Sequence, residues 1–116
     1  MAPIDAMSEI ILYVEDIDRM VAFYEAAFGL EQTGGAPEHG FVRFDTGDCE
    51  LCLHAGRDGD VGEYAPKVVF AVEDLEAARS HLESFDVELG EVRTPTPDTR
   101  VVDGVDPEGN RFAIEA

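Results

Sequence analysis

The sequence has little positive charge. Its 116 residues include 8 Lys and Arg against 26 Asp and Glu, which gives a formal net charge of -18 at pH 7. Such an acidic surface repels phosphate groups, so we expect no nucleic acid and no anionic membrane as a partner. No apolar run approaches the roughly 20 residues that span a bilayer, and residues 1–5 lack the basic start of a secretion signal. We therefore expect a soluble, cytoplasmic protein.

Lysine is especially scarce, because Lys67 is the only one and the other basic residues are arginines. An acidic, lysine-poor surface resembles that of proteins from organisms that keep molar salt in the cytoplasm. Molar salt shortens the Debye length to about 3 Å and so screens self-repulsion. We interpret the acidity as a halophilic adaptation of the surface, and not as a device for attracting a cationic ligand. The interpretation predicts a loss of structure in dilute buffer.

Cysteine is also scarce, and Cys49 and Cys52 are the only two. Their C-x-x-C spacing is compatible with a redox pair or half of a zinc site. Redox pairs usually open a helix, whereas the residues here alternate as in a strand. A zinc site needs a second ligand pair at similar spacing, and the sequence has none. We predict two unpaired cysteines in a strand.

The chain contains an internal repeat at half its length. Val14–Ile17 returns 58 residues later as Val72–Leu75. Each copy follows an apolar stretch and precedes a helical pattern, and Asp16 and Asp74 are placed to cap the two helices. Gly29 supplies a left-handed stop after the first helix. Each half therefore predicts one strand, one helix and three further strands.

The repeat divides the chain into a first module over 1–55, a linker over 56–66 and a second module over 67–116. Turn residues mark 34–35 and 94–97. We expect helices over 17–28 and 75–85, and strands over 10–13, 30–33, 40–45, 49–54, 68–71, 87–92, 99–103 and 111–115. Neither half is large enough for a secure core of its own, so we expect the two to combine, within one chain or between chains.

Several segments resemble those of the vicinal oxygen chelate superfamily, which includes glyoxalase I, bleomycin-resistance proteins and extradiol dioxygenases. The segments are Tyr13–Asp16, Ala22–Tyr24, Phe28–Leu30 and the closing Asp106–Phe112, and the resemblance covers nearly the whole chain. It implies an α+β fold of two βαβββ modules that form an open, curled mixed sheet around a cleft, with two helices packed outside. It also implies a homodimer.

The resemblance implies a metal-ligand position on the first and on the last strand of each module. These positions fall on Glu9, Cys52, Lys67 and Ala113. Alanine offers no ligand and lysine repels a cation, so we interpret the set as a lost metal site without a cofactor. We expect Glu9 and Lys67 to form an ion pair across the cleft; two separate exposed charges are the alternative.

A second ligand set uses Glu9, His54 and Glu115. Two carboxylates and one imidazole could hold Zn, Fe, Mn or Ni as a cofactor. The structural alternative is that His54 and Glu115 lie at strand ends near solvent. Both residues, with Cys52 and Ala113, are expected to face the cleft, because strand side chains alternate.

Other side chains are expected to complete the cleft. Ile11, Tyr13 and Val69 would give it an apolar lining, which is typical of a small-molecule site. Arg43 and Arg100 are expected at similar places in the third strand of each module, where an arginine can receive an anionic ligand group. Surface ion pairing is the alternative for both arginines.

Three functions remain open at this point. The first is metal-free binding of a small organic molecule, as the resemblance to resistance proteins implies. The second is a metal-dependent lyase, isomerase or dioxygenase that uses the displaced ligand set. The third is a non-catalytic partner protein with a filled cleft. Fold alone does not choose among them.

Overall fold

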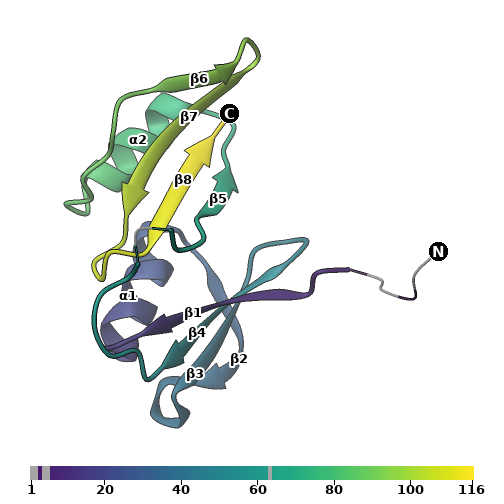
Figure 1. The fold of residues 1–116 in the computed structure, drawn as a ribbon, viewed down its shortest axis with the longest axis vertical. Coiled ribbons are helices and arrows are strands. Elements are labelled where there is room, and N and C mark those ends of the chain that lie inside the picture. The colour runs from purple at the N-terminus through teal and green to yellow at the C-terminus, as the bar shows by residue number, and fades with distance from the viewer. Residues whose placement is uncertain (1–2, 4–5, 63) are drawn as a thin grey trace. The chain divides into compact units, whose positions relative to one another are not determined.

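The computed structural model describes residues 3, 6–62 and 64–116, so most of the segment on which the absence of a secretion signal depends lies outside it. The chain divides into two units, Met1–Asp58 and Gly59–Ala116. The boundary falls within the segment expected to link the modules. Each unit has the element order βαβββ (Figure 1).

The first module is a four-stranded mixed sheet with one helix. Its strands lie in the order β1-β4-β3-β2, with β1 parallel to β4 and the other pairs antiparallel. Its elements are β1 (Glu9–Val14), α1 (Ile17–Ala27), β2 (Glu31–Ala36), the short 3-10 helix η1 (Pro37–His39), β3 (Phe41–Asp45) and β4 (Glu50–Ala55).

The second module repeats this topology, with the order β5-β8-β7-β6 and β5 parallel to β8. Its elements are β5 (Val68–Ala71), α2 (Leu75–Glu83), β6 (Arg93–Thr96), β7 (Thr99–Val105) and β8 (Arg111–Glu115). The expected α+β fold of two βαβββ modules is therefore confirmed. No helix in the described part of the chain is long and apolar enough to cross a membrane.

The predicted capping residues of the helices are confirmed. The Asp16 carboxylate accepts a hydrogen bond from the Arg19 amide at 3.1 Å, and Asp74 accepts one from the Ala77 amide at 3.0 Å. Gly29 follows α1 with φ 65°, in the left-handed region where glycine lacks the Cβ clash of other residues. The repeat therefore specifies the same helix start in both modules.

Each helix covers one face of its own sheet. In the first module Tyr24 of α1 packs on Phe44 of β3, with ring centroids 6.5 Å apart and both side chains fully buried. In the second module α2 contacts β8, and its residues Leu75 and Leu82 are buried. The opposite face of each sheet is left without a helix from its own module.

The sequence predicts the second strand of the second module over 87–92, and this prediction is wrong. The strand is β6, over Arg93–Thr96, where the sequence indicates a turn. Leu89 makes only an isolated bridge to Gly104. Pro95 fits β6 because this is the edge strand of the sheet, and an edge strand tolerates a residue without an amide hydrogen.

The predicted turn at Gly34 and Gly35 is also wrong, because both glycines lie inside β2. The register between β2 and β3 shifts between Gln32 and Gly34, which marks a bulge. Gly35 has φ 73°, and a Cβ there would lie 2.1 Å from the Phe41 carbonyl oxygen. The glycines therefore allow a close approach between two strands instead of ending one.

Candidate functional site

The uncovered sheet face of the first module carries most of the residues expected in the site. Ile11 lies beside Cys52, and Tyr13 beside His54, in the parallel pairing of β1 with β4. Arg43 of β3 is paired with Cys52 from the other side. Strand alternation places these side chains on the face opposite to α1.

An ion cluster, which we call the Glu9 cluster (Glu9, Arg43, Glu50 and Cys52), occupies one end of this face. Arg43 Nη1 lies 2.6 Å from Glu9 Oε2 and 3.6 Å from Glu50 Oε1. The Cys52 thiol donates to the same Glu9 oxygen at 3.4 Å. Burial, with the hydrogen bond and the charge of Glu9, raises the pKa of Cys52 to about 11, so this thiol is protonated at neutral pH. Both cysteines are free, as predicted.

The uncovered face of the second module carries a cluster of the opposite sign, which we call the Asp103 cluster (Lys67, Arg93 and Asp103). Lys67 Nζ lies 2.9 Å from Asp103 Oδ1, and Arg93 Nε lies 2.6 Å from Asp103 Oδ2. The hydrogen bond from Arg93 lowers the pKa of Asp103, and Lys67 adds to this effect. Asp103 is paired with Ala113, which in turn is paired with Val69.

The predicted equivalence of Arg43 and Arg100 is wrong. The partner of Cys52 on β3 is Arg43, and the partner of Ala113 on β7 is Asp103. Arg100 instead donates a hydrogen bond of 2.8 Å to Glu76 of α2, so it lies on the helix side of its sheet. The connections before the last strand of each module, 46–49 and 106–110, differ in length. The 58-residue spacing of the repeat is therefore not kept between the third strands of the two modules.

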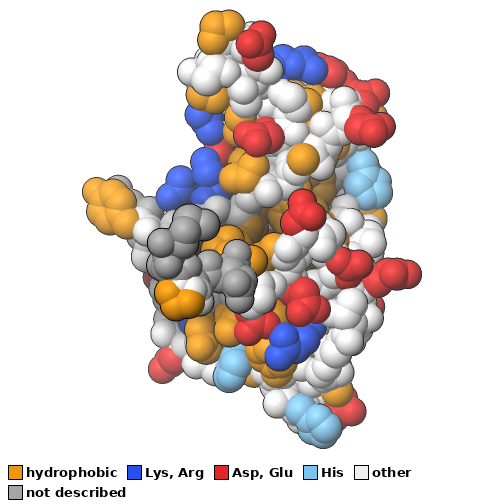
Figure 2. Space-filling view, turned by 90° about the vertical axis from the view of Figure 1, so that its right-hand side faces the viewer, with side chains coloured by type: hydrophobic (Ala, Val, Ile, Leu, Met, Phe, Trp, Pro, Cys, Tyr) orange, Lys and Arg blue, Asp and Glu red, His pale blue; other side chains and the backbone are white. Residues whose placement is uncertain are grey.

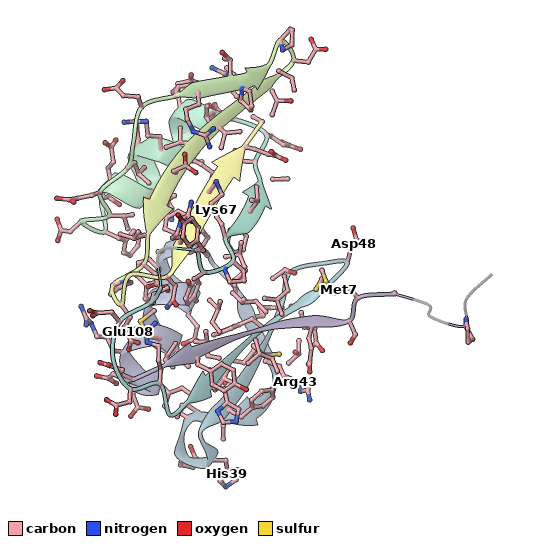
Figure 3. All side chains as sticks on the ribbon, viewed as in Figure 1. Met7, His39, Arg43, Asp48, Lys67 and Glu108 are labelled. Carbon is pink, nitrogen blue, oxygen red and sulfur yellow. The ribbon has the colours of Figure 1, made fainter. Side chains whose placement is uncertain are left out.

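The expected ion pair between Glu9 and Lys67 stays a prediction, because the two residues belong to different units. Figure 3 labels Arg43 and Lys67, one in each module. Within its own module, Glu9 is bonded to Arg43 and Lys67 to Asp103. Each of the two charges therefore has a partner of opposite sign nearby.

The donor chemistry does not fit a divalent metal ion at the positions that the resemblance implies. Lys67 is a cation that repels a metal ion, and Ala113 has no donor atom. Glu9 is engaged by Arg43 and Cys52. Within either unit, no described group of three His, Cys, Asp or Glu side chains lies close enough together to hold a metal.

The alternative ligand set is divided between the modules. Glu9 and His54 lie on the first, whereas Glu115 lies at the end of β8 in the second, in register with Ala71. His54 and Glu115 are both exposed. Because the three side chains belong to two different units, this ligand set stays a prediction.

A cavity of about 370 Å³ lies in the second module, beside the Asp103 cluster. Its lining includes two basic residues, two acidic residues and two large apolar residues: Lys67, Arg111, Glu88, Asp103, Leu89 and Phe112. The lining is therefore strongly charged, with positive and negative side chains beside a smaller apolar part. Sequence reasoning found only Lys67 of this set, because Glu88 and Leu89 lie in the segment that was predicted as a strand.

These features define a class of α+β proteins that contain two βαβββ modules, in each of which one face of the sheet carries no helix of that module. The chain belongs to the glyoxalase/bleomycin resistance protein/dioxygenase superfamily, whose family model matches residues 6–114. No curated protein sequence matches it.

Solved structures with the same fold are similar to this chain over nearly its whole length. A glyoxalase family protein from Bacillus anthracis is 18% identical, with a TM-score of 0.83 and coverage of 99% of this chain and 97% of that one. Lactoylglutathione lyase from Agrobacterium tumefaciens is 23% identical, with a TM-score of 0.77 and coverage of 98% and 95%. The fosfomycin resistance protein from Listeria monocytogenes, solved with Mn(II), is 19% identical, with a TM-score of 0.81 and coverage of 96% and 89%.

Proposed function

We propose that this chain binds a small organic molecule without a metal ion. The observation that carries the proposal is the chemistry at the four positions where the family resemblance implies metal ligands. Two of them, Glu9 and Lys67, are engaged in ion pairs within their own modules. Ala113 has no donor atom. Glyoxalase-type chemistry needs a Lewis acid to stabilise an enediolate, and this set gives that ion no site.

Two features support a small molecule as the ligand. The second module has a cavity of about 370 Å³, which lies within the usual range of roughly 300–1,000 Å³ for ligand pockets. The uncovered sheet faces also expose large apolar side chains, among them Tyr13 at 52% and Val69 at 48% of their surface. Exposed apolar groups beside fixed charges favour an organic ligand with few polar groups.

Native mass spectrometry in volatile high-salt buffer tests the proposal directly. We expect a co-purified organic mass that is lost on denaturation, no stoichiometric metal, and a dimer as the subunit number. A transition metal bound at one ion per chain would contradict the metal-free function.

Thermal melting with added Zn²⁺, Mn²⁺ or Ni²⁺ gives an independent measurement. A metal at a hundredfold its Kd would add about 2.7 kcal/mol to the free energy of unfolding, and we expect no such increase. The matched control is the double variant Lys67→His, Ala113→Glu, which restores donor atoms at both positions and which we expect to gain metal-dependent stability. A metal-dependent stability gain of this size in the wild type would count against the proposal.

A further inference from the structure

The cavity of the second module is lined by charged side chains of both signs. Lys67 and Arg111 are its cations, and Glu88 and Asp103 are its carboxylates. Asp103 accepts hydrogen bonds from Lys67 at 2.9 Å and from Arg93 at 2.6 Å, so the chain itself compensates its charge. Glu88 is exposed, and its carboxylate has no bonded partner among the residues that the structure describes. A ligand in this cavity therefore meets both cations and an uncompensated carboxylate.

The two cations lie side by side at one end of the cavity. β5 runs parallel to β8, with Val68 in register with Phe112. Lys67 and Arg111 directly precede these two residues, so they occupy neighbouring places on adjacent strands and share one face of the sheet. An arginine fork beside a second cation suits a ligand carboxylate, because charge-assisted hydrogen bonds to carboxylate oxygens are strong.

Glu88 lies at the other end of the cavity, across β7 from the cations. Val105 is the β7 partner of Arg111. Leu89 bridges Gly104 in the antiparallel orientation, which places Glu88 beside Val105. Because side chains alternate, Glu88 lies on the face opposite to Leu89, which is the face of Arg111. A row of side chains therefore crosses this face with cations first, an apolar residue next and a carboxylate last.

The middle of this row is apolar. Val105 is 44% exposed, and it lines the cavity together with Leu89 and Phe112. Neighbouring strands lie about 4.8 Å apart, so the backbones at Arg111 and Glu88 are separated by about 10 Å. This spacing leaves room for a short apolar chain between a group held by Arg111 and a group held by Glu88.

The order of the charges favours a ligand that carries both signs. An anion gains only at the end formed by Lys67 and Arg111, and a cation gains only at Glu88. A ligand with a carboxylate and an ammonium group gains at both ends. Contact pairs that are partly buried are screened by salt much less than separated surface charges, and the Lys67 side chain is only 28% exposed. The preference should therefore persist in the salt that we expect to stabilise this chain.

We propose that this cavity binds a small zwitterion whose carboxylate and ammonium groups are joined by a short apolar chain. The inference rests on the proposed function and adds the class of ligand and its orientation. Lys67 and Arg111 receive the carboxylate, and Glu88 receives the ammonium group. Val105 contacts the apolar chain between them.

Four probes with equal numbers of carbon atoms separate these contributions: 6-aminohexanoate (both charges), hexanoate (anion), hexylamine (a cation at neutral pH) and 1-hexanol (uncharged). Binding is followed by NMR titration of the isotope-labelled chain, in the lowest KCl concentration at which thermal melting shows it to be folded. We expect 6-aminohexanoate to bind about threefold or more tighter than each of the other probes. It should shift the amide signals of Gly90 and Gly104, which line the cavity.

Two variants separate the ends of the cavity. Glu88→Gln should weaken the binding of 6-aminohexanoate about twofold to fivefold, as expected for a partly exposed ion pair, and should not weaken that of hexanoate. Arg111→Gln should weaken the binding of both carboxylate probes by a similar factor and should not weaken that of hexylamine. A general loss of structure would not produce this opposite dependence on the probe.

Glu91→Gln and Arg19→Gln are the matched controls, because both residues are exposed and neither lines the cavity. They make the same changes of charge and should leave the four affinities unchanged. The inference is overturned if 6-aminohexanoate binds no more tightly than the other probes, or if the controls weaken binding as much as the cavity variants do. A co-purified organic mass without a metal would in those cases leave the proposed function standing, whereas a stoichiometric metal would contradict that function.

Discussion

Equivalent places on the two sheets carry reversed charges. Arg43 lies between Glu9 and Glu50 in the first module, and Asp103 lies between Lys67 and Arg93 in the second. In each case a central group on the third strand compensates two charges of the opposite sign. Glu9, which would attract a metal ion, and Lys67, which would repel one, are therefore both held in ion pairs within their own modules.

Asp103→Asn tests the energetic role of the Asp103 cluster. The pKa of Asp103 is lowered in the folded chain, so its ionised form stabilises the fold above the unfolded pKa of about 3.9. This stabilisation is lost as the pH falls through the depressed folded value. We expect the wild type to lose more unfolding free energy than the variant as the pH falls below about 4.

At pH 7 the same variant should be less stable by under about 1 kcal/mol, since exposed ion pairs are weakened by solvent screening and the Asp103 side chain is 38% exposed. Urea unfolding at one fixed ionic strength measures both effects. The control is Asp98→Asn, which removes an exposed carboxylate from the turn between β6 and β7. Parallel pH curves for wild type and Asp103→Asn would show that the cluster does not stabilise the fold.

At the scale of the element, β7 depends on one small residue. A Cβ at Gly104 would lie 2.7 Å from Phe112 Cζ and 2.8 Å from Leu89 Cδ2. Gly104→Ala should therefore destabilise the chain by about 1–3 kcal/mol, the usual cost of overpacking. Gly90→Ala is the matched control, because its nearest neighbour would be the Asp103 carbonyl oxygen at 3.7 Å. Chemical denaturation measures both, and equal losses would contradict the packing argument.

Most elements could be predicted because their signals are local. The caps Asp16 and Asp74 and the left-handed Gly29 lie next to the residues they act on. The strand β6 could not be predicted in this way, because Pro95 is acceptable only at a sheet edge. Which strand is the edge depends on the order of all four strands, and that order is tertiary information.

The strand pairing agrees with the sheet face predicted in the first module and differs from the prediction in the second. Alternation along β1 and β4 places Tyr13 and His54 on one face, as the pairing shows. The sheet faces of Arg100 and Asp103 could not be predicted in this way, because they depend on the register of β7 against β8. Asp103 is the β7 partner of Ala113. The sequence alone does not reveal this pairing, because it depends on how β7 is aligned with β8.

At the scale of the whole molecule, the surface carries far more negative than positive charge. Acidic side chains are spread over both modules on the face shown in Figure 2. The basic residues are largely engaged, as in the pairs Arg43–Glu9, Arg93–Asp103 and Arg100–Glu76. Eight cations cannot compensate 26 carboxylates, so a net charge of -18 remains, and it opposes the compact state.

Salt should therefore stabilise this chain strongly. The Debye length falls from about 30 Å at 0.01 M to about 3 Å at 1 M, so repulsion among the surplus carboxylates fades over this range. We expect the melting temperature to rise steadily from dilute buffer to 2 M KCl, and to rise much less in sucrose of equal osmolality, which does not screen charge. A melting temperature that is the same in dilute buffer and in molar KCl would show that self-repulsion is not what limits the stability of this fold. It would also remove the reason for attributing the acidic, lysine-poor surface to life in high salt.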